Sequence, residues 1–170
     1  MNNYHKISVE IPGVGSLSLL ADALDAALCF VKFGNCAGGK IKSTPLLQDA
    51  EEQLLQYFAG RLTRFQLPVK YNGTPFQETI WHILTKIPCG KLVSYKQLAA
   101  AAGHSNAFRA AGMANNKNPL PIVIPCHRVV NHNGKPGGYA SGTELKQKLL
   151  SIEGIEMVNG KFPASDFYGL

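Results

Sequence analysis

The sequence is organised around the segment PLPIVIPCHRVV, residues 119–130. Two prolines near its start stop any preceding helix, because proline lacks a backbone N–H and clashes with the previous helical turn. The apolar run at 122–124 predicts a short buried strand. Pro125 ends that strand, so we expect Cys126 to emerge at the edge of a sheet rather than inside it.

Cys126 is followed by two side chains that can activate a thiol. The thiolate is the nucleophilic form of cysteine, and its pKa falls beside cationic or proton-accepting groups. His127 and Arg128 carry such groups. Adjacent side chains of an extended chain point in opposite directions, so His127 could act through a water molecule. A Cys-His pair also occurs by chance, and alone it does not assign catalysis.

Short helices precede this segment. The boxes at 74–77 and 94–97 each have a hydroxyl residue at the cap and glutamine three positions later, which predicts two helix starts. Gly103 stops the second helix, and Ser105 is expected to cap a third that runs to Ala114. Two short helices joined by a tight turn fit a helix-turn-helix, with an ordinary helical hairpin as the alternative.

The N-terminal half favours a sheet covered by one helix. A strand at 7–11 and apolar runs at 17–21 and 26–33 predict a small antiparallel sheet, although 21–28 is also compatible with a helix. Thr44-Pro45 predicts a helix start. The apolar positions expected to pack that helix on the sheet are Leu47, Ala50, Leu54 and Phe58. This half shows no catalytic cluster, so we expect it to be a supporting α/β domain.

Composition limits the class of protein. Apolar residues make up 45% of the chain and no apolar run approaches the roughly 20 residues of a membrane span, so we expect a cytoplasmic protein that contacts no membrane. Residues 1–74 hold 7 Lys/Arg against 6 Asp/Glu, and residues 75–170 hold 10 against 5. The excess of positive charge in the second half suggests a polyanionic partner. The alternative is that it arose by chance on a solvated surface.

The other cysteines do not form a recognisable site. Cys29 lies in an apolar run and is expected to be buried and inert, while Cys36 and Cys89 stand near glycines and are expected in loops. No Cys-x-x-Cys pair or cluster at metal-ligand spacing is present, so we expect neither a metal nor a cofactor.

Residues 73–154 resemble the C-terminal domain of the O6-alkylguanine-DNA alkyltransferases, also called methylated-DNA–protein-cysteine methyltransferases. The matching pieces keep family order and spacing: 73–77, Ser94-Tyr95, Arg109-Ala110, Asn118-Pro119, 125–129, 137–139 and Glu153-Gly154. The resemblance implies an α+β protein with a ribonuclease-H-like N-terminal domain at 1–70. It also implies a winged-helix-like helix-turn-helix domain at 74–158, followed by a tail at 159–170.

The resemblance also implies an activity. The family moves an alkyl group irreversibly from O6-alkylguanine in duplex DNA, with O4-alkylthymine as a second candidate substrate, onto its own cysteine after base flipping. Cys126 matches that acceptor, and His127 matches the base that draws its proton through water. Glu153 matches the carboxylate that orients the histidine, and Asn118 matches the side chain that braces the neighbouring turn.

Further residues are assigned by the same match. The substrate pocket is expected to contain Tyr95, Met113, Val129, Gly137 and Tyr139. Contacts to double-stranded DNA, bound through the minor groove by a monomer, are expected from Ser94, Arg109, Ala110, Gly112 and Arg128. Arg109 would hold the space left by the flipped base.

Two other functions fit parts of the pattern. Alkyltransferase-like proteins bind the lesion without chemistry, but they typically carry another residue where this chain has Cys126. A cysteine hydrolase would use Cys126 with a histidine, and it would leave the basic half and the helix-turn-helix unexplained. After Met113-Ala114 the chain also departs from many relatives, with Asn115-Asn116-Lys117 where they carry a glycine or an arginine.

Overall fold

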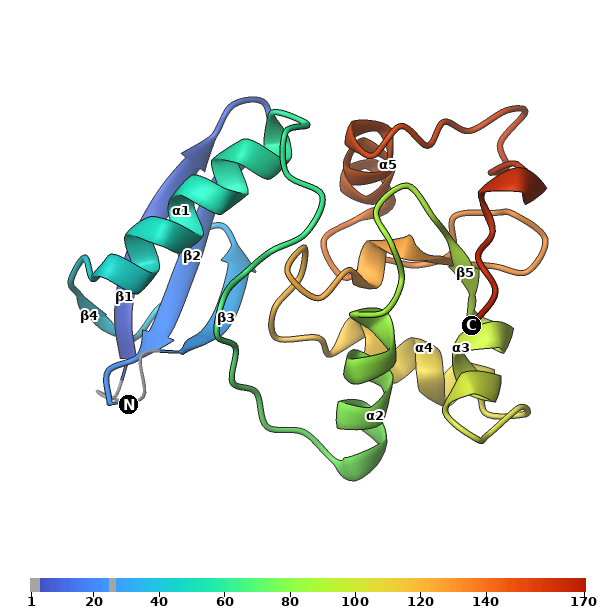
Figure 1. Ribbon diagram of the computed structural model, residues 1–170, viewed down its shortest axis with the longest axis horizontal. Coiled ribbons are helices and arrows are strands. Elements are labelled where there is room, and N and C mark those ends of the chain that lie inside the picture. Colours follow the sequence, from blue (N-terminus) through green and yellow to red (C-terminus); the bar gives the residue numbers. More distant parts are fainter. Residues whose placement is uncertain (1–3, 25–26) are drawn as a thin grey trace. The chain divides into compact units, whose positions relative to one another are not determined.

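The computed structural model describes residues 4–24 and 27–170 and divides the chain into two compact units, one ending at Tyr71 and the other running from Asn72 to Leu170 (Figure 1). Ala26, where one apolar run was expected to begin, lies outside the described residues. The expected α+β class is confirmed, with a sheet and one helix in unit 1 and mainly short helices in unit 2.

Unit 1 is a four-stranded sheet in the order β3-β2-β1-β4. Strands β1 (Tyr4–Ile11), β2 (Gly15–Asp22) and β3 (Leu28–Phe33) pair antiparallel, as predicted. The short β4 (Lys40–Ile41) pairs parallel with β1 and was not predicted, because two residues carry no readable periodicity.

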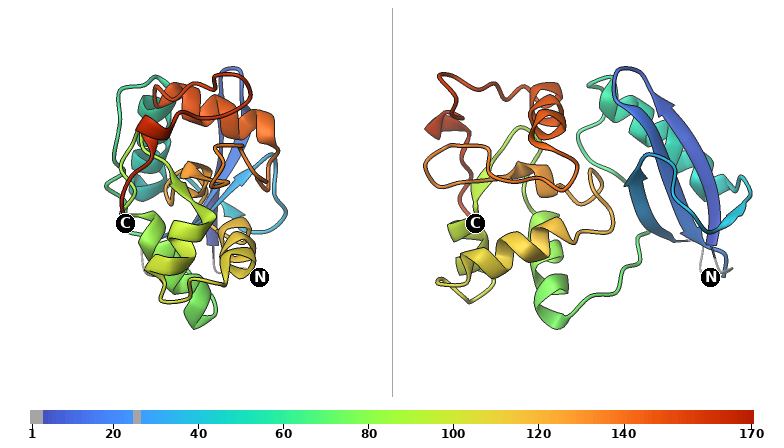
Figure 2. Two further views of the ribbon diagram at one scale, coloured as in Figure 1. Left: turned by 90° about the vertical axis from the view of Figure 1, so that its right-hand side faces the viewer. Right: turned by 180° about the vertical axis from the view of Figure 1, so that it is seen from behind.

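Helix α1 (Pro45–Phe58) covers one face of this sheet (Figures 1 and 2). The Thr44 side chain accepts a hydrogen bond from the Leu47 N–H, and proline occupies the first turn, as the sequence predicted. The prediction for the buried stripe is wrong at its last position, because Tyr57 is 1% exposed whereas Phe58 is only half-buried. The stripe is therefore Leu47, Ala50, Leu54 and Tyr57.

Unit 2 contains the remaining elements. They are α2 (Pro75–Leu84), β5 (Val93–Ser94), α3 (Tyr95–Ala101), α4 (Phe108–Asn116), η1 (Cys126–Arg128), β6 (Val129–Val130), α5 (Thr143–Ile152) and η2 (Ala164–Asp166). Both predicted capping boxes are present, at Thr74 and at Ser94. Helices α3 and α4 pack on each other and on α2, where the Trp81 indole donates to the Ala114 carbonyl at 2.9 Å.

Two local predictions for unit 2 are wrong. Helix α4 begins at Phe108 without a side-chain cap, because the chain first makes a turn in which the Ala107 N–H bonds to the His104 carbonyl; Ser105 does not cap it. Residues 122 and 123 form a turn and not a strand, with Ile122 at φ 75°, and Ile124 makes an isolated bridge with Pro121. The strand lies further on, where β6 pairs parallel with β5. A three-residue apolar run between prolines does not distinguish the two structures.

The C-terminal segment 159–170 packs on the rest of unit 2. Leu92 exchanges backbone hydrogen bonds with Asp166 and Tyr168, and Phe162 joins a buried cluster with Val130 and Leu150. Over the described ranges, none of the helices has the length and apolar character that crossing a bilayer requires.

Candidate functional site

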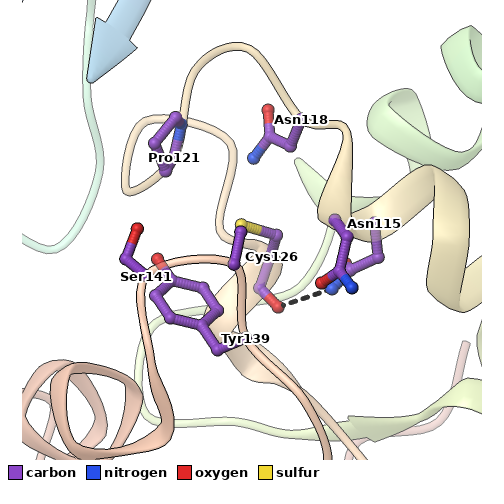
Figure 3. A pocket seen from close by; sticks show the side chains of 8 residues that line it. Asn115, Asn118, Pro121, Cys126, Tyr139 and Ser141 are labelled. Atoms are coloured by element: carbon purple, nitrogen blue, oxygen red, sulfur yellow. Dashed lines mark hydrogen bonds between the residues drawn. The ribbon is translucent and has the colours of Figure 1, made fainter. Parts of the chain in front are cut away.

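Cys126 begins η1 in the wall of a pocket in unit 2 (Figure 3). The residue is 4% exposed. The pocket is small and partly open to solvent. It is lined by the end of α4, the following loop and a second loop: Asn115, Asn116, Asn118, Pro121, Cys126, Tyr139, Ala140 and Ser141.

The surroundings of the sulfur act on its ionisation in opposite directions. Burial raises the pKa of the Cys126 thiol, whereas hydrogen bonds with Asn118 and Tyr139 and the positive charge of Lys146 lower it. Burial dominates, so the resting group is a thiol. The polar partners are nevertheless placed to stabilise a thiolate once the proton leaves.

Behind Cys126, His127 and Glu153 form a buried pair. The His127 Nε2 lies 2.8 Å from the Glu153 Oε1, and both side chains are 0% exposed. An ionised carboxylate only accepts hydrogen bonds, so Nε2 carries the proton and Nδ1 is the acceptor nitrogen of the ring. This tautomer is the one a general base requires.

Arg128 holds the carboxylate from a second side. Its Nε donates to Glu153 Oε2 at 2.9 Å and its Nη2 donates to Glu153 Oε1 at 2.9 Å. Its Nη1 donates to the Ile87 carbonyl, and the Gly90 N–H donates to Glu153 Oε2 at 3.1 Å. Arg128 is only 6% exposed. The expectation that it contacts DNA is therefore corrected, because its guanidinium is committed to Glu153.

These contacts set the charges of the pair. Burial by itself raises the pKa of Glu153, but hydrogen bonds and charges from His127 and Arg128 outweigh it and hold that pKa well below its usual range. Burial lowers the pKa of His127, and the bond to Glu153 opposes this only in part. The pair is thus a neutral imidazole on an ionised carboxylate. Burial and the Glu153 charge also raise the pKa of Cys89, which stays a thiol.

Asn118 spans the turn that leads from α4 to Cys126. Its Nδ2 donates to the Ile124 carbonyl at 2.7 Å, and its Oδ1 accepts from the Leu120 N–H at 3.0 Å. Because Asn118 also bonds to the sulfur, a single amide links the shape of this turn to the state of the thiol.

Tyr95 lies between two glycines rather than in the pocket wall. A Cβ on Gly137 would meet the Tyr95 ring at 2.9 Å, and one on Gly112 would meet it at 3.6 Å. The Tyr95 hydroxyl donates to the Gly138 carbonyl at 3.1 Å. Burial raises the pKa of this phenol to about 12, so it remains a donor. Tyr95 and Gly137 therefore fix the loop that carries Tyr139.

Of the five residues expected in the pocket, only Tyr139 lines the cavity described above. Val129 is fully buried in β6, and Met113 is 63% exposed on α4. Met113 is exposed because it lies one helical turn after Arg109, on the outer face of the helix. Ser94, expected at the DNA, is 4% exposed and is occupied as the cap of α3.

The outer face of α4 carries Arg109, Ala110 and Met113, all exposed, followed by Asn116 and Lys117. The Arg109 guanidinium lies 5.8 Å from the centre of the Phe108 ring. Gly112 is half-buried against Tyr95. A helix face with a cation and small side chains can approach another surface closely.

Sequence reasoning missed Lys146, whose side chain is 0% exposed in α5. Its Nζ donates to the carbonyls of Val129, Pro136 and Gly138. Burial lowers its pKa to about 8. Its burial could have been predicted from its spacing. Lys146 stands three and four positions before the buried leucines of α5, so it lies on the same apolar face of the helix. Within residues 4–24 and 27–170, no group of three His, Cys, Asp or Glu side chains is placed to hold a metal ion.

Comparison with known proteins matches both units. Residues 75–155 match the model of the 6-O-methylguanine DNA methyltransferase DNA-binding domain, and residues 14–71 match that family's ribonuclease-like domain. The chain is 50% identical over 115 residues to a constitutive methylated-DNA–protein-cysteine methyltransferase of Bacillus subtilis, covering 67% of this chain and 70% of that protein. A Methanosarcina barkeri methyltransferase of the same name is 44% identical, covering 66% and 72%. The structure also resembles Mycobacterium tuberculosis OGT in complex with DNA, with a TM-score of 0.79 and 34% identity, covering 88% and 92% of the two chains.

Proposed function

The chain belongs to the 6-O-methylguanine DNA methyltransferase family, and from this membership we propose that Cys126 is the residue that receives the alkyl group. The protein acts in DNA repair by transferring an alkyl group from damaged DNA to a cysteine. Support for Cys126 comes from its place in a pocket wall, in contact with Asn118 and Tyr139 and next in sequence to the His127–Glu153 pair. That arrangement is the observation on which the assignment depends.

The chemistry is a displacement at the alkyl carbon. His127 draws the thiol proton through a water molecule, and Glu153 stabilises the imidazolium that forms. The sulfur attacks the alkyl carbon and a C–S bond forms. The bond from that carbon to O6 breaks, its electron pair stays on the guanine, and the base takes up a proton. The product is a thioether on Cys126 and an unmodified guanine.

The transfer happens once per molecule. A thioether has no ionisable proton and is a poor leaving group, so nothing in the site restores the thiol. The reaction therefore consumes one protein for each lesion, and the amount of protein sets the repair capacity.

DNA contact is assigned to the outer face of α4. O6 of a paired guanine cannot reach a buried sulfur, so the damaged nucleotide has to leave the stack. Ala110 and Gly112 allow a close approach to the minor groove, and Arg109 enters the stack to hold the vacated space. One chain carries both the pocket and the outer face of α4, and the protein is proposed to act as a monomer.

The test is to incubate the protein with a duplex containing O6-methylguanine and to map methylated peptides by mass spectrometry. The methyl group is expected on the peptide that contains Cys126, and Cys126→Ser should abolish the transfer. Cys89→Ser is the matched control and should retain it. Methylation of another cysteine would contradict the assignment. Lesion binding without any transfer would instead favour a non-catalytic lesion-binding protein.

A further inference from the structure

Asn115 is a buried amide in the wall of the same pocket. It lies in the last turn of α4, is 1% exposed, and lines the cavity with Cys126. Its Nδ2 donates to the Cys126 carbonyl at 3.2 Å, and Figure 3 shows the amide turned toward that carbonyl. Because a carbonyl can only accept, this contact fixes which end of the amide is nitrogen and which is oxygen.

The other end of the amide is unsatisfied. Within the described part of the chain, the buried Asn115 Oδ1 has no hydrogen-bond partner. An unpaired buried acceptor is costly and uncommon, so it requires an explanation. Since Asn115 belongs to the pocket wall, a ligand that enters the pocket can bring the missing donor.

The chemistry of the substrate limits what that donor can be. An alkyl group on O6 leaves N1 of guanine without a proton, so the 2-amino group is the only N–H donor on the pairing edge. O4-alkylthymine has no N–H on that edge, because its N3 is also unprotonated. An acceptor in the pocket wall therefore distinguishes the two lesions.

We propose that Asn115 is a specificity-determining residue whose Oδ1 accepts a hydrogen bond from the 2-amino group of the extruded O6-alkylguanine, while its Nδ2 holds the Cys126 carbonyl. The inference rests on the proposed function, since it assumes that the damaged base enters this pocket. It assigns the site a preference for guanine lesions over O4-alkylthymine. It also explains the polar Asn115 at a position that could otherwise be filled by an apolar side chain.

The test compares single-turnover methyl transfer from two duplexes that differ by one group. One contains O6-methylguanine and the other contains O6-methylhypoxanthine, which lacks only the 2-amino group. The native protein is expected to react about threefold to tenfold faster with the first, the range of one hydrogen bond. Asn115→Leu, which keeps the approximate shape and removes the acceptor, should bring that ratio close to one.

Two further variants control the result. Asn115→Asp keeps an acceptor oxygen but loses the donor to the Cys126 carbonyl, so both rates should fall while the ratio between them is retained. Asn72→Leu, at an exposed site outside the pocket, should leave both rates unchanged. Asn115→Ala removes the acceptor without added bulk and serves if the leucine variant does not fold. The ratio is measured within one sample, so it does not depend on the active fraction.

An unchanged ratio in both the leucine and alanine variants overturns the role of Asn115. That result leaves the proposed function intact, because methyl transfer to Cys126 is still observed. Absence of methyl on Cys126 with either duplex overturns the proposed function instead. The two failures are therefore distinguishable in the same experiment.

Discussion

The imidazole of His127 and the carboxylate of Glu153 meet at 2.8 Å although they are 26 positions apart in the chain. The side chains of both are completely buried, and Arg128 satisfies the remaining side of the carboxylate. The contact fixes the tautomer of the histidine and keeps the charge of Glu153 in place. The ionisation of this pair affects two measurable properties, the rate of alkyl transfer and the stability of the fold.

The first concerns the pH dependence of alkyl transfer. Because burial lowers the pKa of His127, its imidazole stays neutral and able to accept a proton below the ordinary value of about 6.5. Single-turnover rates measured from about pH 5 to pH 8 should therefore fall only on the acid side of that value. An acid limb at or above it would contradict a depressed pKa.

The second concerns stability in acid. The pKa of Glu153 is lower in the folded protein than in the unfolded chain, so the folded state is stabilised above the unfolded value of about 4.3. That stabilisation is lost as the pH falls from this value through the folded pKa. In urea unfolding measured at several pH values, the free energy of unfolding should fall less steeply with decreasing pH for Glu153→Gln than for the native protein. Glu144→Gln, at an exposed position, should follow the native curve.

Gly137 should not tolerate a side chain. A Cβ there would lie 2.9 Å from the Tyr95 ring, and the backbone has φ 70°, which L-residues rarely adopt. Gly137→Ala should lower the free energy of unfolding by about 1–3 kcal/mol, measured by chemical denaturation. Gly138→Ala is the matched control, because nothing lies within 4 Å of a Cβ at that position. Equal losses at the two glycines would argue against the steric explanation.

Lys146 should stabilise the loop that carries Tyr139. Lys146→Met leaves the carbonyls of Val129, Pro136 and Gly138 without their shared donor. We expect a loss of about 1–3 kcal/mol in unfolding free energy and slower methyl transfer. Lys148→Met changes an exposed lysine of the same helix and should cost less than about 0.5 kcal/mol. Equal stability of the two variants would show that Lys146 does not anchor the loop.

Arg109 should matter for duplex substrates in particular. Its side chain is exposed on α4 and is proposed to replace the extruded base in the stack. Arg109→Ala should therefore reduce transfer from O6-methylguanine in a duplex more than from the same lesion in a single strand, where no stacked space has to be held. Arg109→Lys keeps the positive charge, so it distinguishes the attraction of the side chain to phosphate from its insertion into the base stack. A uniform reduction on both substrates would indicate attraction to phosphate alone.

Local rules in the sequence predicted the features that depend on neighbouring residues. The boxes at Thr74 and Ser94 and the Thr44-Pro45 start are satisfied within one helical turn, and each was correct. These rules did not distinguish a turn from a strand at residues 122–124. The prolines on either side of this run have no N–H to donate, and a three-residue apolar run fits either structure. Helix α4 also begins later than the sequence predicted, because a backbone turn precedes it.

The sequence by itself determined the two capped helix starts of unit 2, because these depend on short-range spacing. Its resemblance to a known family implied the fold class and supplied Cys126 as the proposed acceptor. Only the tertiary structure decided that Arg128 is bound to Glu153, that Lys146 is buried and that Asn115 keeps an unsatisfied oxygen. The physical reason is that burial and pairing depend on which distant segments of the chain come into contact. A lysine or arginine residue looks the same in the sequence whether its side chain is exposed or buried.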